Sequence, residues 1–295
     1  MIVPGVLMAK FGLSNPLFGK GIANLILYVT QPALIIFAYI RDFDREILIR
    51  ALIVLLFAII AHLIFTLIAF LLYKKHPSDI QAVLRFATIF TNAGYMGIPL
   101  IKSILNDEAT IYASIYVIVF NIFVWTVGCY IFTGDKKYIS LKKALLNPAT
   151  ISTAVGFIIF IFPINQHLPD VAINLLIGLK DMVAPLSMLL IGLQLAKIEL
   201  KGIFKDLLMY KFLALRMLII PTIVWALLKA VSLLGYSDPT VMTVTLLCSA
   251  TPVATATSMF AEIFDGNTVY SSKIVSISTV LSLLTMPIIA LLLNV

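Results

Sequence analysis

The sequence Thr91-Asn92-Ala93-Gly94-Tyr95-Met96-Gly97-Ile98-Pro99-Leu100 places an amide, two glycines and a proline inside an apolar stretch that is long enough to cross a bilayer. Glycine and proline both disfavour the interior of a regular helix, so we expect the helix to break here. In hydrocarbon a freed backbone group costs several kcal/mol, and a break is tolerated only where it packs in protein or lines an aqueous cavity. The stretch therefore predicts a binding site at membrane depth.

The composition indicates that the whole chain lies in a membrane. Of its 295 residues, 61% are hydrophobic and 12% are charged, and the mean hydropathy is +1.09. Apolar stretches of about 20 residues, the length that spans a bilayer, follow one another from end to end. A shorter one, residues 1–11, reaches about half of the membrane core and is interpreted as the tail of a further helix. The nine full spans that we expect are residues 21–40, 47–72, 82–104, 110–132, 145–163, 170–196, 204–233, 240–263 and 268–293.

Matched prolines suggest that these spans form an internal repeat. Pro32 and Pro185 are separated by 185 − 32 = 153 positions, and Pro99 and Pro252 by 252 − 99 = 153. A proline inside a helix removes a hydrogen bond and clashes with the preceding turn, so matched prolines indicate matched helices. We expect an all-α polytopic membrane protein with one transmembrane domain (1–295) and a truncated first helix. Its parts are repeat 1 (1–132), a loop (133–144) and repeat 2 (145–295).

The basic residues divide unequally between the two membrane faces. If successive loops alternate between faces, one face carries 14 of these residues and the other carries 5. By the positive-inside rule the first face is cytoplasmic, so both termini of this cell-membrane protein are expected outside. The net charge of +7 is assigned to orientation and to anionic lipids, and nucleic acid is not an expected partner. The 14 are Lys10, Lys20, Lys74, Lys75, Arg85, Lys136, Lys137, Lys142, Lys143, Lys197, Lys201, Lys205, Lys211 and Lys273, and the 5 are Arg41, Arg45, Arg50, Lys102 and Lys229.

Two stretches resemble a known transporter family. Residues 92–100, with Lys102 just after them, resemble the N-x-G-(F/Y)-M-G-I-P-L element of the auxin efflux carrier family, which includes plant auxin exporters and bacterial malate or malonate permeases. Residues 249–254, followed by Ala261-Glu262, resemble the second proline-broken helix of that family. The resemblance extends to a wider group that includes bile-acid sodium symporters. It implies two inverted repeats of five helices, whose broken fourth helices cross at mid-membrane.

Such a crossing would bring opposite partial charges together. The free N–H groups at the start of a half-helix stabilise a carboxylate, whereas carbonyls at a half-helix end favour a cation. We expect the half-helices to begin near Gly97 and Val253. No metal site is assigned, and carbonyls near Asn92 and Thr251 are the place considered for sodium. The predicted substrate-binding residues are Asn92, Gly94, Gly97, Pro99, Asn121, Thr251, Pro252, Val253 and Thr255.

Four ionisable residues are candidates for binding a coupling ion. Asp181 is the leading one, because burial raises the pKa of a carboxyl group and would let it load and release a proton. Lys180 is its neighbour, and the two are also interpreted as structural partners of each other or of Arg216. His62 is equally interpreted as a packing residue, and Glu262 as a gate residue or an interfacial charge.

We therefore expect a secondary transporter that moves a small organic anion, auxin-like or a dicarboxylate, by alternating access of the elevator or rocking type. Protons, sodium or no ion at all could be coupled; no cofactor is expected, and a homodimer is left open. One alternative is an intramembrane hydrolase, but Asp181 lacks a second carboxylate and His62 lacks a G-x-S-x-G motif. The other is a passive channel, which would need a continuous polar stripe, and the polar breaks here are isolated.

Overall fold

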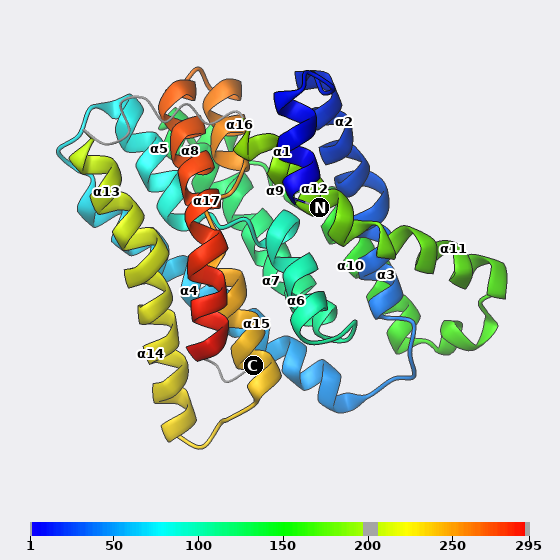
Figure 1. The fold of residues 1–295 in the computed structure, drawn as a ribbon. Helices are drawn as coiled ribbons and strands as arrows, with labels where there is room; N and C mark the ends of the chain where they lie inside the picture. Colours follow the sequence, from blue (N-terminus) through cyan, green and yellow to red (C-terminus); the bar gives the residue numbers. More distant parts are fainter. Residues whose placement is uncertain (1, 197–205, 293–295) are drawn as a thin grey trace.

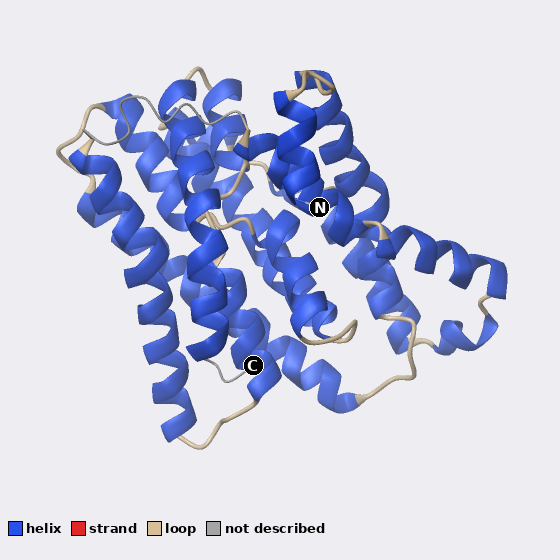
Figure 2. Ribbon diagram, in the orientation of Figure 1, coloured by secondary structure: helices blue, strands red, loops and turns tan. Residues whose placement is uncertain are grey.

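A computed structural model describes residues 2–196 and 206–292 of the chain. Figure 2 shows that these residues form helices joined by short loops. Within them the only extended pairing is an isolated antiparallel bridge between Thr91 and Val253.

The helices fall into longer α-helices and short turns of π- or 3-10 type. The α-helices are α1 (Ile2–Lys10), α2 (Pro16–Leu25), α3 (Gln31–Ala38), α4 (Arg45–Leu72), α5 (Ser78–Ile89), α6 (Ile98–Ile104), α7 (Ala109–Phe123), α8 (Cys129–Thr133), α9 (Leu141–Leu145), α10 (Pro148–Ile161), α11 (Asp170–Asp181), α12 (Val183–Leu195), α13 (Leu207–Ala214), α14 (Ile220–Leu233), α15 (Pro239–Ala250), α16 (Ala256–Ile263) and α17 (Thr268–Leu292). The short turns are η1 (Ile26–Thr30), η2 (Ala93–Gly97), η3 (Val124–Gly128), η4 (Lys136–Tyr138), η5 (Pro163–His167) and η7 (Leu215–Ile219).

Most of the predicted spans are present as continuous helices. The helices Lys136–Leu145 and Pro148–Ile161 together form one further candidate for a membrane span among the described residues, and they are bent by 42° relative to each other. The predicted spans 82–104 and 240–263 are broken, and no half exceeds 12 residues. The protein is thus an all-α polytopic membrane protein, as predicted. Among residues 2–196 and 206–292, the six helical segments long and apolar enough to cross a membrane are Leu17–Ala38, Arg45–Leu72, Ala109–Thr133, Asp170–Leu193, Leu207–Leu233 and Thr268–Leu291.

Helix α4 carries large side chains on its exposed face and small ones on its buried face. It is apolar on all sides, so its sequence has almost no hydrophobic asymmetry for a water-facing surface. Its large side chains point outward, and its small ones pack inward against α5, α7 and α15. The outward residues, each more than half exposed, are Leu52, Leu56, Leu63, Leu67 and Leu71; buried alanines are Ala51, Ala58, Ala61 and Ala69.

A polar cap followed by proline begins two of the helices that approach the site. Asn147 Oδ1 accepts a hydrogen bond from the Ala149 amide at 3.0 Å, and Pro148 opens α10. Asp238 Oδ1 accepts one from the Val241 amide at 2.9 Å ahead of α15. Proline suits a first helical turn because its missing N–H would have had no partner there.

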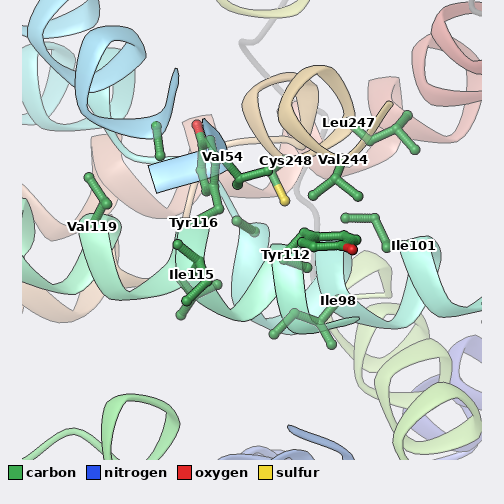
Figure 3. Packing of buried hydrophobic residues seen from close by; sticks show 14 of the residues in the cluster. Val54, Ile98, Ile101, Tyr112, Ile115, Tyr116, Val119, Val244, Leu247 and Cys248 are labelled. Atoms are coloured by element: carbon green, nitrogen blue, oxygen red, sulfur yellow. The ribbon is translucent and has the colours of Figure 1, made fainter. Parts of the chain in front are cut away.

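Helix α7 lies at the centre of the fold. It is buried along most of its length and packs against α4, α6, α10 and α15. Figure 3 shows Tyr112 of α7 between Val244 of α15 and Ile98 of α6, within one buried cluster. Because α6 and α15 belong to the two broken helices, this packing holds both breaks against the same central helix.

The helices form two groups, which are visible in Figure 1. The panel group consists of α1–α3 and α10–α12, and the core group consists of α4–α8 and α13–α17; most close helix pairs lie within a group. In the panel group α1 crosses α12 closely, since a Cβ atom added to Gly5 would lie 2.9 Å from Gly192 Cα. The groups meet mainly where α7 packs against α3 and α10, and where α12 packs against α17 and α6.

The offset of 153 positions between the prolines does not align the two helix breaks, and the predicted start of the first half-helix near Gly97 is wrong. Thr91 pairs with Val253, a separation of 253 − 91 = 162 positions instead of 153. Pro252 lies in the extended break, whereas Pro99 lies at the start of α6, where proline is compatible with a helix. The first helix therefore breaks at residues 90–92 and resumes at Ala93, and not near Gly97. The inverted relation of the two repeats stays a prediction.

Candidate functional site

The two helix breaks pair with each other through their backbones. The Asn92 amide donates to the Pro252 carbonyl at 2.8 Å, and the Ala254 amide donates to the Phe90 carbonyl at 3.0 Å. Between these bonds lies the antiparallel bridge of Thr91 and Val253. Each break thus supplies hydrogen-bond partners that the other lost on leaving its helix, which is the requirement for non-helical backbone inside a membrane.

Both chains resume a helix directly after this pairing. The first backbone bonds of the resumed helices are those of Met96 and Gly97 to the Asn92 carbonyl and that of Thr257 to the Ala254 carbonyl. The amides of residues 93–95 and 255–256 precede these bonds, as the first amides of any helix must. They carry the positive end of each helix dipole.

A cavity of about 260 Å³ lies where these two helix starts meet the panel group. Gly94, Tyr95, Thr255 and Ala256, from the helix starts, form part of its wall. Among the described residues, its wall contains no lysine, arginine, aspartate or glutamate. The other polar wall residues are Gln31, Thr91, Asn92, Asn121 and Asn147, and the aromatic ones besides Tyr95 are Phe120, Trp125 and Phe260.

Four of the predicted substrate-binding residues come together on this cavity: Asn92, Gly94, Asn121 and Thr255. Asn92 is 5% exposed and, with Thr255, also lines a neighbouring cavity of about 90 Å³ against Ser187 of α12. Asn121 Nδ2 donates to Thr150 Oγ1 at 3.3 Å, so this amide also joins α7 to α10.

Five predicted residues lie at the crossover but off that cavity. Pro252 and Val253 are buried in the backbone pairing, and the Val253 amide donates to Ser278 Oγ at 3.2 Å. Thr251 Oγ1 donates to the Cys248 carbonyl at 2.9 Å. A Cβ atom on Gly97 would meet Thr251 Cγ2 at 3.5 Å, an ordinary contact, and Pro99 lines a different cavity of about 200 Å³. Their positions indicate that they shape the crossing.

Gln31 and Asn147 are cavity residues that the sequence did not single out as binding residues. Gln31 follows the π-turn η1, and its Nε2 atom would lie 3.6 Å from a Cβ atom on Gly94. Asn147 caps the start of α10 and also lines the cavity. The sequence signal that could have identified Gln31 as a binding residue is its position: a side-chain amide next to Pro32 inside an apolar span.

The coupling candidates do not lie on the cavity. The expectation that Asp181 is buried is wrong: its side chain is 59% exposed and lies 2.9 Å from Lys102 Nζ and 3.5 Å from Lys180 Nζ. Lys180 pairs with Asp107 at 3.0 Å, and its Nζ lies over the Phe37 ring at 4.3 Å. Asp181 is exposed because it is the last residue of α11, at the joint between α11 and α12.

His62 and Glu262 lie elsewhere in the core group. His62 is fully buried among aromatic rings, and its Nδ1 lies 2.8 Å from the Ala58 carbonyl oxygen. Glu262 is exposed on α16. Within the described residues no group of three or more His, Cys, Asp or Glu side chains could hold a metal ion.

Arg216, which the sequence analysis considered only as a structural partner of Lys180 and Asp181, lies at the end of α15. It is fully buried, and its guanidinium donates to the Ser249 carbonyl at 3.0 and 3.1 Å and to the Thr251 carbonyl at 2.8 Å. The carbonyl of Thr251, considered above for a sodium ion, therefore accepts a hydrogen bond from a cationic side chain.

Comparison with known proteins connects this crossover to a transport family. A family model described as membrane transport protein matches residues 1–142 and 137–290, which is nearly the whole chain. A search of curated proteins finds no match. Together with the crossover, the match shows that the chain belongs to the membrane transport protein family of the auxin efflux carriers.

Proposed function

We propose that this membrane transporter is a secondary carrier that binds a small organic anion at the crossover and moves it by alternating access. The observation that carries the proposal is that two helix starts and several neutral amide or hydroxyl side chains share one cavity. Helix N-termini bind carboxylates through free N–H groups and the dipole. A carboxylate held by neutral donors leaves more easily than one held by a lysine or arginine, and a carrier must release its substrate.

The cavity also limits the class of anion. Its volume of about 260 Å³ is near the lower end for ligand sites, which favours a molecule of few carbon atoms or one ring. Aromatic side chains, among them Phe120 and Trp125, offer a surface for an apolar portion of the substrate. Auxin-like acids and short dicarboxylates both meet the size limit, and the aromatic wall favours the former.

Ion pairs between the two helix groups support alternating access. Arg41, after α3, pairs with Glu108 at 2.8 Å, while Lys180 of α11 pairs with Asp107 at 3.0 Å. Lys102 of α6 pairs with Asp181 of α11 at 2.9 Å. In the described chain, all ion pairs between the panel and core groups involve α6 or the turn that follows it. Such pairs would close the carrier at this end and separate when the groups move.

Counterflow in proteoliposomes tests the proposed function. Vesicles loaded with unlabelled acid should transiently accumulate the labelled acid above its external level, because a carrier exchanges one bound molecule for another. We expect this for indole-3-acetate or malonate, with saturation and with the recovered label chemically unchanged. Label that equilibrates without overshoot would indicate a channel, and converted label would indicate a hydrolase.

Removing the Asn92 amide should weaken binding. Asn92 lines the cavity at the helix start, so Asn92→Ala should raise the Kd of the transported acid by roughly 5- to 150-fold, equivalent to about 1 to 3 kcal/mol. Binding to purified protein provides the measurement. The matched control is Asn165→Ala, because Asn165 contacts the Asp42 carboxylate at the surface. Equal affinities in the two variants would assign Asn92 to packing.

Neutralising Asp181 should leave gradient-driven uptake intact. Its carboxylate is exposed and satisfied by two lysines, so it lacks the burial that a proton carrier in the membrane requires. Uptake by Asp181→Asn under an imposed pH gradient, and separately under a sodium gradient, should match the wild type in each case. Loss of accumulation on the pH gradient alone, with counterflow preserved, would reinstate Asp181 as the coupling group.

A further inference from the structure

Arg216 is a cation buried in the middle of a membrane-spanning segment. It lies in η7, more than two helical turns inside the span Leu207–Leu233, and its exposed fraction is zero. Three hydrogen bonds from its guanidinium go to two backbone carbonyls, those of Ser249 and Thr251. Both carbonyls lie where α15 gives way to the second break.

The end of α15 is a place of negative partial charge. The last carbonyls of a helix have no partner within it and carry the equivalent of about half a negative charge. In secondary transporters, unwound carbonyls and half-helix ends of this kind coordinate the coupling cation. The Arg216 guanidinium therefore fills, with a fixed charge, the position at which a sodium ion would bind.

The charge of Arg216 has no counter-charge in the described part of the chain. No carboxylate there lies within ion-pair distance of it, and its Nε has no hydrogen-bond partner. Neutral polar groups lie at the same helix end: Tyr116 Oη is 3.0 Å from Ser249 Oγ. An unpaired charge at membrane depth is costly, and it marks a site of function more often than of stability.

The second break connects this charge to the cavity. Arg216 holds the break at Thr251, and residues Ala254 and Thr255 of the same break form part of the cavity wall. The segment that Arg216 holds at one end therefore contributes to the cavity wall a few residues further along the chain. An anion in the cavity would supply the missing counter-charge.

We propose that Arg216 is a resident cation that takes the place of a coupling sodium ion at the crossover. As a positioning residue, it fixes the end of α15 and supplies there the permanent positive charge that a coupling cation would otherwise supply, while the neutral donors of the cavity hold the carboxylate. Substrate binding is consequently independent of sodium. The part of this inference that concerns the substrate rests on the proposed function. The effect of Arg216 on the end of α15 does not depend on any substrate.

The first test uses the wild-type protein. The affinities of purified protein for malonate and indole-3-acetate are measured in sodium chloride and in choline chloride of equal ionic strength. For whichever acid binds, we expect the Kd to agree within about twofold, since no sodium ion takes part in binding. A Kd that rises about tenfold or more in choline would overturn the proposal, because mass action then requires a bound sodium ion.

The second test removes the charge while keeping most of the side-chain volume. Arg216→Met leaves the carbonyls of α15 without a cation, so its melting temperature should fall below that of the wild type and rise again with millimolar guanidinium or with sodium. Arg216→Lys should behave like the wild type. Arg85→Met is the matched control, because Arg85 lies over the Phe70 ring, away from the crossover, and its loss should not create a response to either cation.

These outcomes separate the two proposals. A cation response of Arg216→Met that Arg85→Met lacks supports the resident cation even if neither acid binds to any variant, in which case the proposed function fails. If the wild type binds an acid but Arg216→Met is folded and has no cation response, the resident cation is overturned and the carrier function stands. If Arg216→Met does not fold, the sodium replacement on the wild type decides.

Discussion

The structure depends on the hydrogen bonds between its two helix breaks. A bilayer offers no water to a backbone that has left its helix, so each break must find its partners within the protein. The bonds from Asn92 to Pro252 and from Ala254 to Phe90 meet this requirement for both at once. Because the partners are more than 150 positions apart in the chain, this pairing also holds the halves of the core group together around α7.

The same pairing separates opposite charges at the crossing. The starts of the resumed helices, with their free amides, face the cavity beside the panel group, while the end of α15 faces the interior of the core group, where Arg216 meets it. The proposed anion site therefore lies at the helix starts, and the proposed cation position lies at the end of α15, where the Arg216 side chain binds the carbonyls. Among the described residues, the ion pairs between the panel and core groups involve α6 or the turn that follows it.

Much of this arrangement could be predicted from the sequence, because the strongest signals are local. Apolar length predicted the spans, and the polar residues of 91–100 placed a break near the right position. The break itself falls at Phe90 and Thr91, which carry no local signal for leaving a helix; a bridge to Val253 across the chain selects them. Similarly, Asp181 and Arg216 both lie within apolar spans, yet the first is exposed and the second is buried, because the packing of helices distant in sequence decides which side chains are covered.

The most direct test of the account is to locate a bound substrate. A bromine-labelled acid that competes in counterflow would be bound to the crystallised protein, and its anomalous density would fix the position of the molecule. The account predicts a single site in the cavity of about 260 Å³, with the carboxylate at the amides of residues 93–95 and 255–256 beside Asn92. Density instead at Lys102 and Lys180, with the crossover cavity empty, would contradict it.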